Sequence, residues 1–314
     1  MEILQTVIII ISAIVLFIHG LQNFSKEIQH IGAEKLRQWI SKITQTRLGG
    51  FFLGGITTAI IQSSSAVSSI TVSFVDSGVI TFWESLAILL GTNVGTTATA
   101  WIVTLNSELI GPFFIILGTI ISIVPTRIAT VGKSIFYFGF IFFSLDLISD
   151  AILPLKNNSL LSNVLMQAKN PFLGILYGII VTVIVQSSSV VSGLSIILIS
   201  QGLLSLDAAI PIVIGANIGT TSTAFIAALK LSSTAKLTAL ANFLFNLSGV
   251  VLIFPFMKFL EYFALQLSNS PTIQVAYAHL IFNLIIAVLF LLLLNPIYKL
   301  LIKHKWYVPV KLAQ

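Results

Sequence analysis

The chain contains no cysteine and very few charged residues. None of its 314 residues is Cys, and only 8% are Asp, Glu, Lys or Arg. Without cysteine the chain can form neither a disulfide nor a thiolate metal site. A soluble domain carries about 25% charged residues, so this chain lacks the ions that keep a protein surface in water. Because it also lacks a long polar stretch, we expect one membrane-embedded unit without a separate soluble domain.

Signatures of catalysis are missing as well. The sequence has no Ser-His-Asp arrangement, no His-Asp-Glu metal cluster and no phosphate-binding loop. Glu84 follows Thr81 at capping-box spacing and Asp207 follows Ser205, so we expect these acids to cap helices. His279 lies inside an apolar segment, where we expect a buried neutral side chain with a hydrogen-bond partner. We therefore expect neither an enzyme nor a cofactor nor a resident metal ion.

Apolar segments dominate what is present. Hydrophobic residues make up 56% of the chain, and the mean hydropathy is +1.04. A helix needs about 20 apolar residues to span a bilayer. This criterion predicts an all-α polytopic membrane protein with about seven spanning helices, at residues 3–22, 82–103, 110–124, 133–152, 206–229, 235–257 and 272–294.

Two further apolar stretches are too short to span. Residues 48–61 and 172–185 are each stopped by the sequence Gln-Ser-Ser-Ser, and each resumes for about a dozen residues until Gly78 or Gly202. At about 1.5 Å per residue each arm reaches only about 20 Å. We therefore expect two re-entrant helical hairpins, at 48–77 and 172–201.

The two hairpins belong to an internal repeat. A shift of 124 residues places Gln62 on Gln186, and 15 of the 39 positions in 62–100 are then identical to 186–224. Each unit has three crossings, an odd number, so the second copy should be inverted relative to the first. The expected division is repeat one at 1–124, repeat two at 125–257, and a final spanning helix with a basic cytoplasmic tail at 258–314.

The positive charge has a topological pattern. The net charge is +6, but the basic residues lie in short segments between apolar runs, so we do not expect a nucleic acid partner. With the N-terminus outside and the C-terminus in the cytoplasm, thirteen Lys and Arg residues lie inside and only Lys156, Lys169 and Lys258 outside. Residues 25–44 carry apolar side chains on one helical face, which favours a helix in the cytoplasmic membrane interface.

The repeated Gln-Ser-Ser-Ser segments are the first candidate site. Their hydroxyl and amide groups both donate and accept hydrogen bonds. A broken helix also frees backbone N–H groups, which favour an anion, and carbonyl groups, which suit Na⁺. A single copy would be weak evidence for a binding site, because serine in a membrane helix often forms a hydrogen bond to its own backbone or holds two helices together. Two copies in register favour a binding site.

Each hairpin is followed by a second repeated motif, Gly-x-Asn-x-Gly-Thr-Thr, at 91–97 and 215–221. Two glycines within five residues favour either an interruption of the helix or unusually close helix packing. The Asn and Thr side chains supply further oxygens and amide donors. These are Asn93, Thr96, Thr97, Asn217, Thr220 and Thr221.

The motifs resemble the type II sodium/phosphate cotransporters and their bacterial relatives. The similarity is strongest over Val-Gln-Ser-Ser-Ser-Val-Val at 185–191 and up to Asn-Ile-Gly-Thr-Thr at 221, and it extends to the Phe-Asn pairs at 245–246 and 282–283. The resemblance implies a plasma (inner) membrane protein, a homodimer, and inorganic phosphate and Na⁺ as the partners within the lipid bilayer. It implies phosphate contacts from Gln62, Ser63, Ser64, Ser65, Gln186, Ser187, Ser188, Ser189, Asn93 and Asn217. It implies Na⁺ contacts from Gln62, Ser65, Thr96, Thr97, Gln186, Ser189, Thr220 and Thr221.

Electrostatics independently favours coupling to a cation. No Lys or Arg lies in either hairpin or in the helices after them, so we expect neutral groups to hold the anion. Moving an anion into a cell whose interior is negative costs about 2.3 kcal/mol per charge for about 100 mV, and co-bound Na⁺ would remove this cost. The prediction is secondary active Na⁺/phosphate transport. The alternatives are a phosphate exporter, a carrier of another small oxyanion, an ion channel and a non-transporting sensor.

Overall fold

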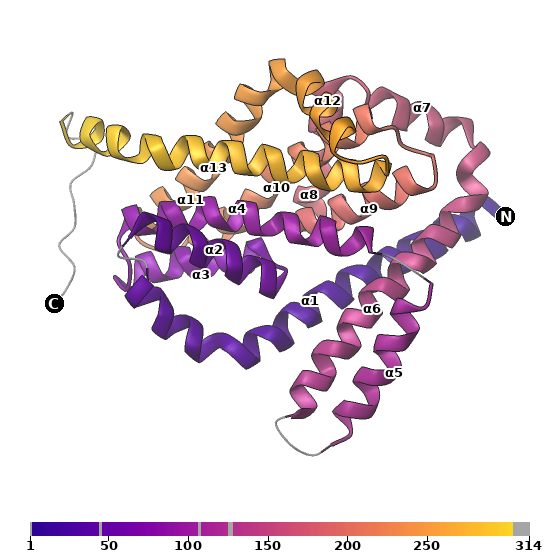
Figure 1. Cartoon of the computed structure of the whole chain (residues 1–314), viewed down its shortest axis with the longest axis horizontal. Coiled ribbons are helices and arrows are strands. Elements are labelled where there is room, and N and C mark those ends of the chain that lie inside the picture. Colours follow the sequence, from indigo (N-terminus) through magenta and orange to yellow (C-terminus); the bar gives the residue numbers. More distant parts are fainter. Residues whose placement is uncertain (1, 44–45, 106–107, 125–127, 304–314) are drawn as a thin grey trace.

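The computed structural model describes residues 2–43, 46–105, 108–124 and 128–303, and every regular element in this part of the chain is a helix (Figure 1). Six helices are long and apolar enough to cross a membrane, or seven if the bent pair at 161–167 and 171–185 counts as a single span. The span expected at 110–124 is not among them, because its helix has only 13 residues. The chain is therefore a multi-pass helical membrane protein, as the composition predicts.

The helices and two short 3₁₀ turns follow one another along the chain with few long connections. Their order is α1 (Glu2–Ile43), α2 (Arg47–Ile61), α3 (Ser64–Asp76), α4 (Phe82–Thr104), α5 (Ile110–Ser122), α6 (Ile128–Ile152), η1 (Leu153–Asn157), α7 (Ser159–Gln167), α8 (Pro171–Val185), α9 (Ser188–Ser200), α10 (Leu206–Ala228), α11 (Ser233–Ile253), η2 (Phe254–Phe256), α12 (Met257–Leu267) and α13 (Pro271–Lys303).

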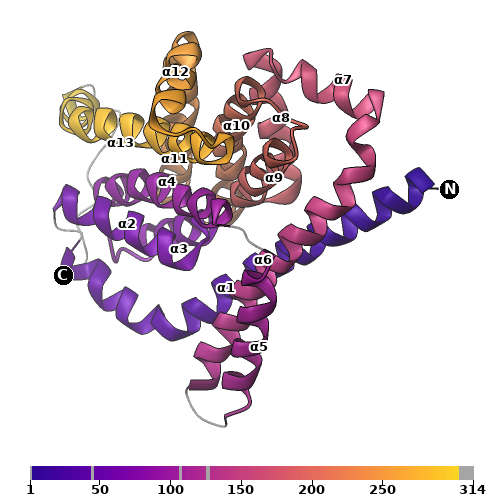
Figure 2. The same cartoon turned by 45° about the vertical axis from the view of Figure 1, so that its right-hand side comes forward.

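Helix α1 is one continuous helix of 42 residues. The spanning segment and the interfacial helix expected at 25–44 are parts of it, and Figures 1 and 2 show it curving past the rest of the chain. Beyond His30 its side chains lie outside the described part of the structure, so the interfacial face stays a prediction. Figure 2 also shows α5 and α6 side by side, projecting away from the other helices.

The segment expected as one helix at 235–257 is divided. Helix α11 ends at Ile253, the turn η2 contains Pro255, and α12 continues to Leu267. Proline has no N–H for the helical ladder and clashes with the preceding turn, which explains the break. Helix α7 was not expected either, and it meets α8 at an angle of 112°.

The two short helix pairs have matching dimensions. Helices α2 and α8 have 15 residues each, and α3 and α9 have 13 each. At 1.5 Å per residue they reach about 22 and 20 Å, less than the ~30 Å of a hydrocarbon core. The chain folds back within the first pair, because Leu53 and Thr57 of α2 line a small pocket together with Val67 and Thr71 of α3.

Glycines fix the short helices against their neighbours. A side chain on Gly54 of α2 would overlap the carbonyl oxygen of Ile88 in α4, and one on Gly178 of α8 would overlap that of Ile212 in α10. Gly91 of α4 lies equally close to the carbonyl oxygen of Phe51 in α2, and Gly215 of α10 to that of Ile175 in α8. Helices α4 and α10 run unbroken through their Gly-x-Asn-x-Gly-Thr-Thr motifs. Close packing is therefore confirmed, and the alternative of a helix interruption is wrong.

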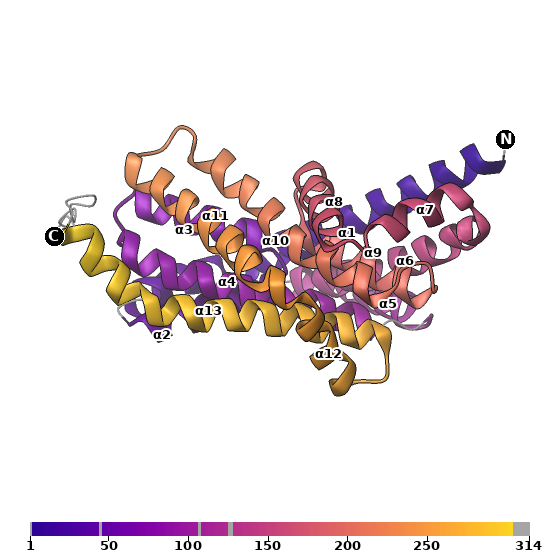
Figure 3. The same cartoon turned by 90° about the horizontal axis from the view of Figure 1, so that it is seen from above.

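The two halves of the chain also meet along the short helix pairs α2–α3 and α8–α9. Fully buried side chains of α1, α6, α9 and α10 form one apolar cluster, including Phe17, Leu145, Val190 and Val213. At the other hairpin, Asp76 at the end of α3 accepts a hydrogen bond of 2.7 Å from the backbone N–H of Ser232, which lowers the pKa of Asp76. Figure 3 shows α3 beside α11, so the first hairpin lies against helices of the second half.

Candidate functional site

Both hairpins turn at a glutamine in the left-handed backbone region. Gln62 has φ 57° and Gln186 has φ 61°, and no other residue except glycine has a positive φ in the described part of the chain. The backbone N–H groups still form the last hydrogen bonds of their helices: that of Gln62 donates to Thr58 O at 2.8 Å, and that of Gln186 donates to Thr182 O at 2.7 Å. Such a conformation costs of order 1–3 kcal/mol in a non-glycine residue. Its recurrence in register indicates that both turns need a glutamine side chain at this point.

The glutamine side chains close the carbonyl ends of α2 and α8. The amide group of Gln186 donates to the carbonyl oxygen of Val183 at 2.7 Å, and that of Gln62 donates to the carbonyl oxygen of Ala59. Gln62 is buried, whereas Gln186 is half-buried. The two turns are thus equivalent in backbone and different in surroundings.

The first serine of each motif caps the following helix. Ser63 accepts a hydrogen bond from the N–H of Ala66 at 3.3 Å, and Ser187 accepts one from the N–H of Val190 at 3.4 Å. The first residues of a helix have no intrahelical partner for their backbone N–H groups. The amide groups of the two serines after each cap are therefore available at the N-termini of α3 and α9.

Both hairpin tips line one pocket of about 330 Å³. The tips touch there, since the hydroxyl group of Ser65 lies 3.5 Å from the carbonyl oxygen of Gln186. All eight Gln and Ser residues predicted at the tips line this pocket, together with Ala66 and one face of α1. The residues from α1 are Leu21, Gln22, Ser25, Lys26 and Gln29.

Thr99 of α4 joins the two tips and was not among the expected site residues. Its hydroxyl group donates to the amide oxygen of Gln62 at 2.8 Å and lies 3.2 Å from the hydroxyl group of Ser189. Because a hydroxyl group has a single hydrogen, Ser189 is the donor in the second bond. The repeat carried a signal for this residue, since Thr223 occupies the equivalent position.

Lys26 is the charged residue of the pocket. No other Lys or Arg and no Asp or Glu is among the residues that line it. The expectation that neutral groups alone surround the site therefore does not hold. The sequence placed Lys26 in a cytoplasmic interface, but α1 continues for a further 17 residues to Ile43 and brings Lys26 beside the hairpin tips.

Asn93 and Asn217 do not line this pocket. Asn93 lies beside Asn246 and Asn283 in a separate, tightly packed region between α4, α11 and α13. Asn217 donates to the side-chain oxygen of Asn283 at 3.2 Å and lies 3.3 Å from Nε2 of His279. These side chains form a second polar cluster, which shares no lining residue with the hairpin tips.

Hydrogen bonds join Asn217, His279 and Asn283 of the second cluster, while Nδ1 of His279 is buried without a partner. The amide group of Asn283 donates to the backbone oxygen of His279 at 2.9 Å, one turn earlier on α13. His279 is 1% exposed, and its Nε2 faces the amide oxygen of Asn217, which can only accept. Nε2 is therefore the protonated nitrogen of a histidine with a neighbouring partner, as expected from the sequence.

The threonines of the repeated motif are bonded within their own helices. The hydroxyl groups of Thr96 and Thr97 donate to the carbonyl oxygens of Thr92 and Val94, at 2.9 and 2.7 Å. Those of the equivalent residues Thr220 and Thr221 likewise donate to Ala216 and Ile218. Their hydrogens are thus occupied by α4 and α10, and only their oxygens remain as acceptors.

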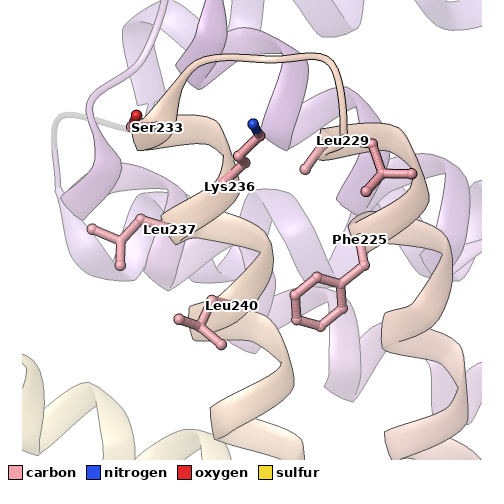
Figure 4. A pocket seen from close by; sticks show the side chains of 7 residues that line it. Phe225, Leu229, Ser233, Lys236, Leu237 and Leu240 are labelled. Atoms are coloured by element: carbon pink, nitrogen blue, oxygen red, sulfur yellow. The ribbon is translucent and has the colours of Figure 1, made fainter.

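A larger pocket of about 430 Å³ lies between α10 and α11 (Figure 4). Phe225 of α10 and Leu229, the residue just after α10, project toward Leu240 and Lys236 of α11, as the figure shows. Apart from Ser233 and Lys236, the side chains of this pocket are apolar. It therefore offers only these two donor side chains, whereas the other pocket has the repeated Gln and Ser residues of both hairpin tips, which remain the candidate site.

Comparison with known proteins agrees with the internal repeat. The Na⁺/Pi-cotransporter family model matches the chain twice, over residues 16–150 and 148–292. The chain is 32% identical to protein YqeW of Bacillus subtilis over 291 residues, which cover 92% of this chain and 94% of YqeW. The chain belongs to the Na⁺/Pi-cotransporter family.

Two other relatives are longer proteins. The chain is 28% identical over 301 residues to YjbB of Escherichia coli, named "Putative inorganic phosphate export protein", and covers 54% of its length. Over 111 residues it is 40% identical to human sodium-dependent phosphate transport protein 2B, which is 32% of this chain and 15% of that protein. No solved structure matches the chain.

Proposed function

We propose that the protein is a secondary active transporter that couples Na⁺ to the movement of inorganic phosphate. The observation that supports this most is the pocket where the N-termini of α3 and α9 meet. Each terminus offers free backbone N–H groups and the positive end of a helix dipole. A tetrahedral oxyanion needs several converging donors, which this pocket has, and an acidic side chain would repel it, which this pocket lacks.

The phosphate contacts come from the serines of the two tips. Ser64, Ser188 and Ser189 are buried, so an anion that displaced water from them would form hydrogen bonds in a low-dielectric environment, where such bonds are strong. Asn93 and Asn217 are outside this proposal, because they belong to the second polar cluster.

The Na⁺ contacts come from oxygens at the same turns. Gln62 and Gln186 lie where α2 and α8 end and the last carbonyl groups lack helical partners. Ser65 and Ser189 lie close by, in the first turn of α3 and α9. Carbonyl and hydroxyl oxygens at a broken helix suit Na⁺. A Na⁺ contact from Thr96, Thr97, Thr220 or Thr221 rests on the family resemblance.

The proposal includes the arrangement in the membrane. The short pairs α2–α3 and α8–α9 are re-entrant hairpins that enter a plasma membrane from opposite sides, within two inverted repeats. Their length, less than a bilayer core, and the double match of the family model support this. The N-terminus is outside, the C-terminus is cytoplasmic, and the resemblance adds a homodimer.

Uptake of labelled phosphate into proteoliposomes tests the coupling. An inward Na⁺ gradient should drive accumulation, and equal uptake with K⁺ or choline would refute Na⁺ coupling. Gln62→Ala and Gln186→Ala should each abolish uptake while the protein still inserts and purifies. If both variants transported normally, the site would be elsewhere.

Export of phosphate is the second candidate, favoured by the name of YjbB, which matches 93% of this chain. The two candidates share one site and differ in the gradient that drives them. Loading the proteoliposomes with phosphate and reversing the Na⁺ gradient measures efflux directly. Bilayer recordings would separate either carrier from a channel, which conducts far faster.

A further inference from the structure

A polar face of α1 lines the pocket together with the hairpin tips. Gln22, Ser25, Lys26 and Gln29 are spaced i, i+3, i+4 and i+7, so they lie on one face of the helix. Ser25 is buried, and it accepts a hydrogen bond of 3.0 Å from the amide group of Gln29. Lys26 is exposed between them, so this face carries a lysine next to two side chains that are hydrogen-bonded to each other.

Lys26 lies near the end of the apolar part of α1, which runs from Leu4 to His30. A cation at this place suits the positive-inside pattern, and the same residue also lines the pocket. No ion pair joins Lys26 to another described residue. Lys26 thus contributes positive charge to a pocket that no acidic side chain lines.

We propose that Lys26 is the electrostatic receptor for the phosphate anion, and that it allows phosphate to bind before Na⁺. This inference rests on the proposed function, because it takes the hairpin tips as the phosphate site.

The charges of the pocket support this role. The N-terminus of a helix is equivalent to about half a positive charge, and both α3 and α9 begin at the pocket. The C-termini of α2 and α8 end at the same turns and offset these half charges. With the ammonium group of Lys26 the pocket therefore carries a net charge of about +1, which matches a phosphate monoanion. Phosphate binding then does not require Na⁺, and Na⁺ serves to offset the charge that moves with the anion across the membrane.

Binding of inorganic phosphate to the purified protein tests the order of binding. Isothermal titration in choline chloride and in NaCl should detect phosphate in both salts for the unmodified protein. Lys26→Gln should weaken binding about tenfold in choline, which corresponds to about 1.4 kcal/mol, and should weaken it less in NaCl. Lys26→Arg keeps the charge and should restore binding to within about twofold.

The matched control is Lys133→Gln, which removes an exposed lysine of α6 that does not line the pocket. It should bind phosphate like the unmodified protein in both salts. Equal affinity of Lys26→Gln and the unmodified protein in choline would overturn the role of Lys26 and leave the proposed function standing. Failure of the unmodified protein to bind phosphate in either salt would overturn the proposed function itself.

Discussion

Thr99 connects elements that are far apart in the sequence. Its hydroxyl group accepts a hydrogen bond from Ser189 of the second hairpin and donates one to Gln62 of the first. Thr99, Gln62 and Ser189 are all buried, and removing one member of a buried polar group leaves its partners unpaired. This one side chain therefore holds the two halves of the pocket in a defined position.

Thr99→Val replaces the hydroxyl group by a methyl group of similar size. The amide oxygen of Gln62 and the hydroxyl group of Ser189 then lose their partner, which lowers the free energy of unfolding by about 1–3 kcal/mol. We therefore expect a lower melting temperature in detergent, and about tenfold slower phosphate transport. Thr99→Ser retains the hydroxyl group and should behave nearly like the unmodified protein. A Thr99→Val variant with unchanged stability and transport would show that this contact has no role.

At the level of single residues, the sequence could identify groups that repeat but not groups that the fold brings in. The eight tip residues were predictable because both copies lie in one register and carry side chains that an apolar segment has no other reason to keep. Thr99 was predictable in principle, since Thr223 repeats it. Lys26 was not, because its place depends on the path of α1 past the hairpins, which no local pattern encodes.

Helix packing in each repeat depends on glycines that allow two backbones to touch. Gly50 and Gly54 lie one turn apart on α2 and differ sharply in this respect. A Cβ atom on Gly50 would lie 3.4 Å from that of Ala87, an ordinary contact, whereas one on Gly54 would overlap the backbone of Ile88. The two positions form a matched pair of substitutions within a single helix.

Gly54→Ala should destabilise the protein by about 1–3 kcal/mol, because α2 must move away from α4. Gly50→Ala should be neutral or stabilise the helix by up to about 1 kcal/mol, since alanine favours the helical backbone. Thermal unfolding in detergent measures both variants. Equal melting temperatures would show that the two helices do not pack through Gly54.

At the level of elements, the sequence predicted long helices well and breaks less well. The spans at 82–103 and 206–229 were found within one residue of α4 and α10. The glycines in these two spans were compatible with either a helix interruption or close helix packing. Only the close approach of α2 and α8 to these glycines shows that they serve packing. The break at Pro255 and the continuous α1 were missed, because apolar composition alone does not report where a helix bends or continues.

Orientation in the membrane is a property of the whole molecule. Inverted repeats with the N-terminus outside place the turn at Lys156 outside and the turn at Lys230 inside, and both side chains are exposed. Because the chain has no cysteine, a single introduced cysteine is the only thiol that a maleimide can label.

A membrane-impermeant maleimide should label Lys156→Cys in intact cells and Lys230→Cys only after the cells are permeabilised. The distribution of Lys and Arg predicts this result. Labelling of both positions in intact cells would exclude inverted repeats, and the reverse pattern would place the N-terminus in the cytoplasm.

Thr99 and its repeat partner Thr223 show that the two halves are not in the same state. Thr99 joins Gln62 to Ser189, but Thr223 donates to the backbone of Thr220. In the repeat, Thr223 corresponds to Thr99, Gln186 to Gln62, and Ser65 to Ser189, so the equivalent bridge would join Gln186 to Ser65 through Thr223. In alternating access the halves exchange conformations, so the pocket would open to the other side with Thr223 as its bridge. Thr223→Val should then slow transport without lowering the stability of the present state, and a loss of stability equal to that of Thr99→Val would exclude the exchange.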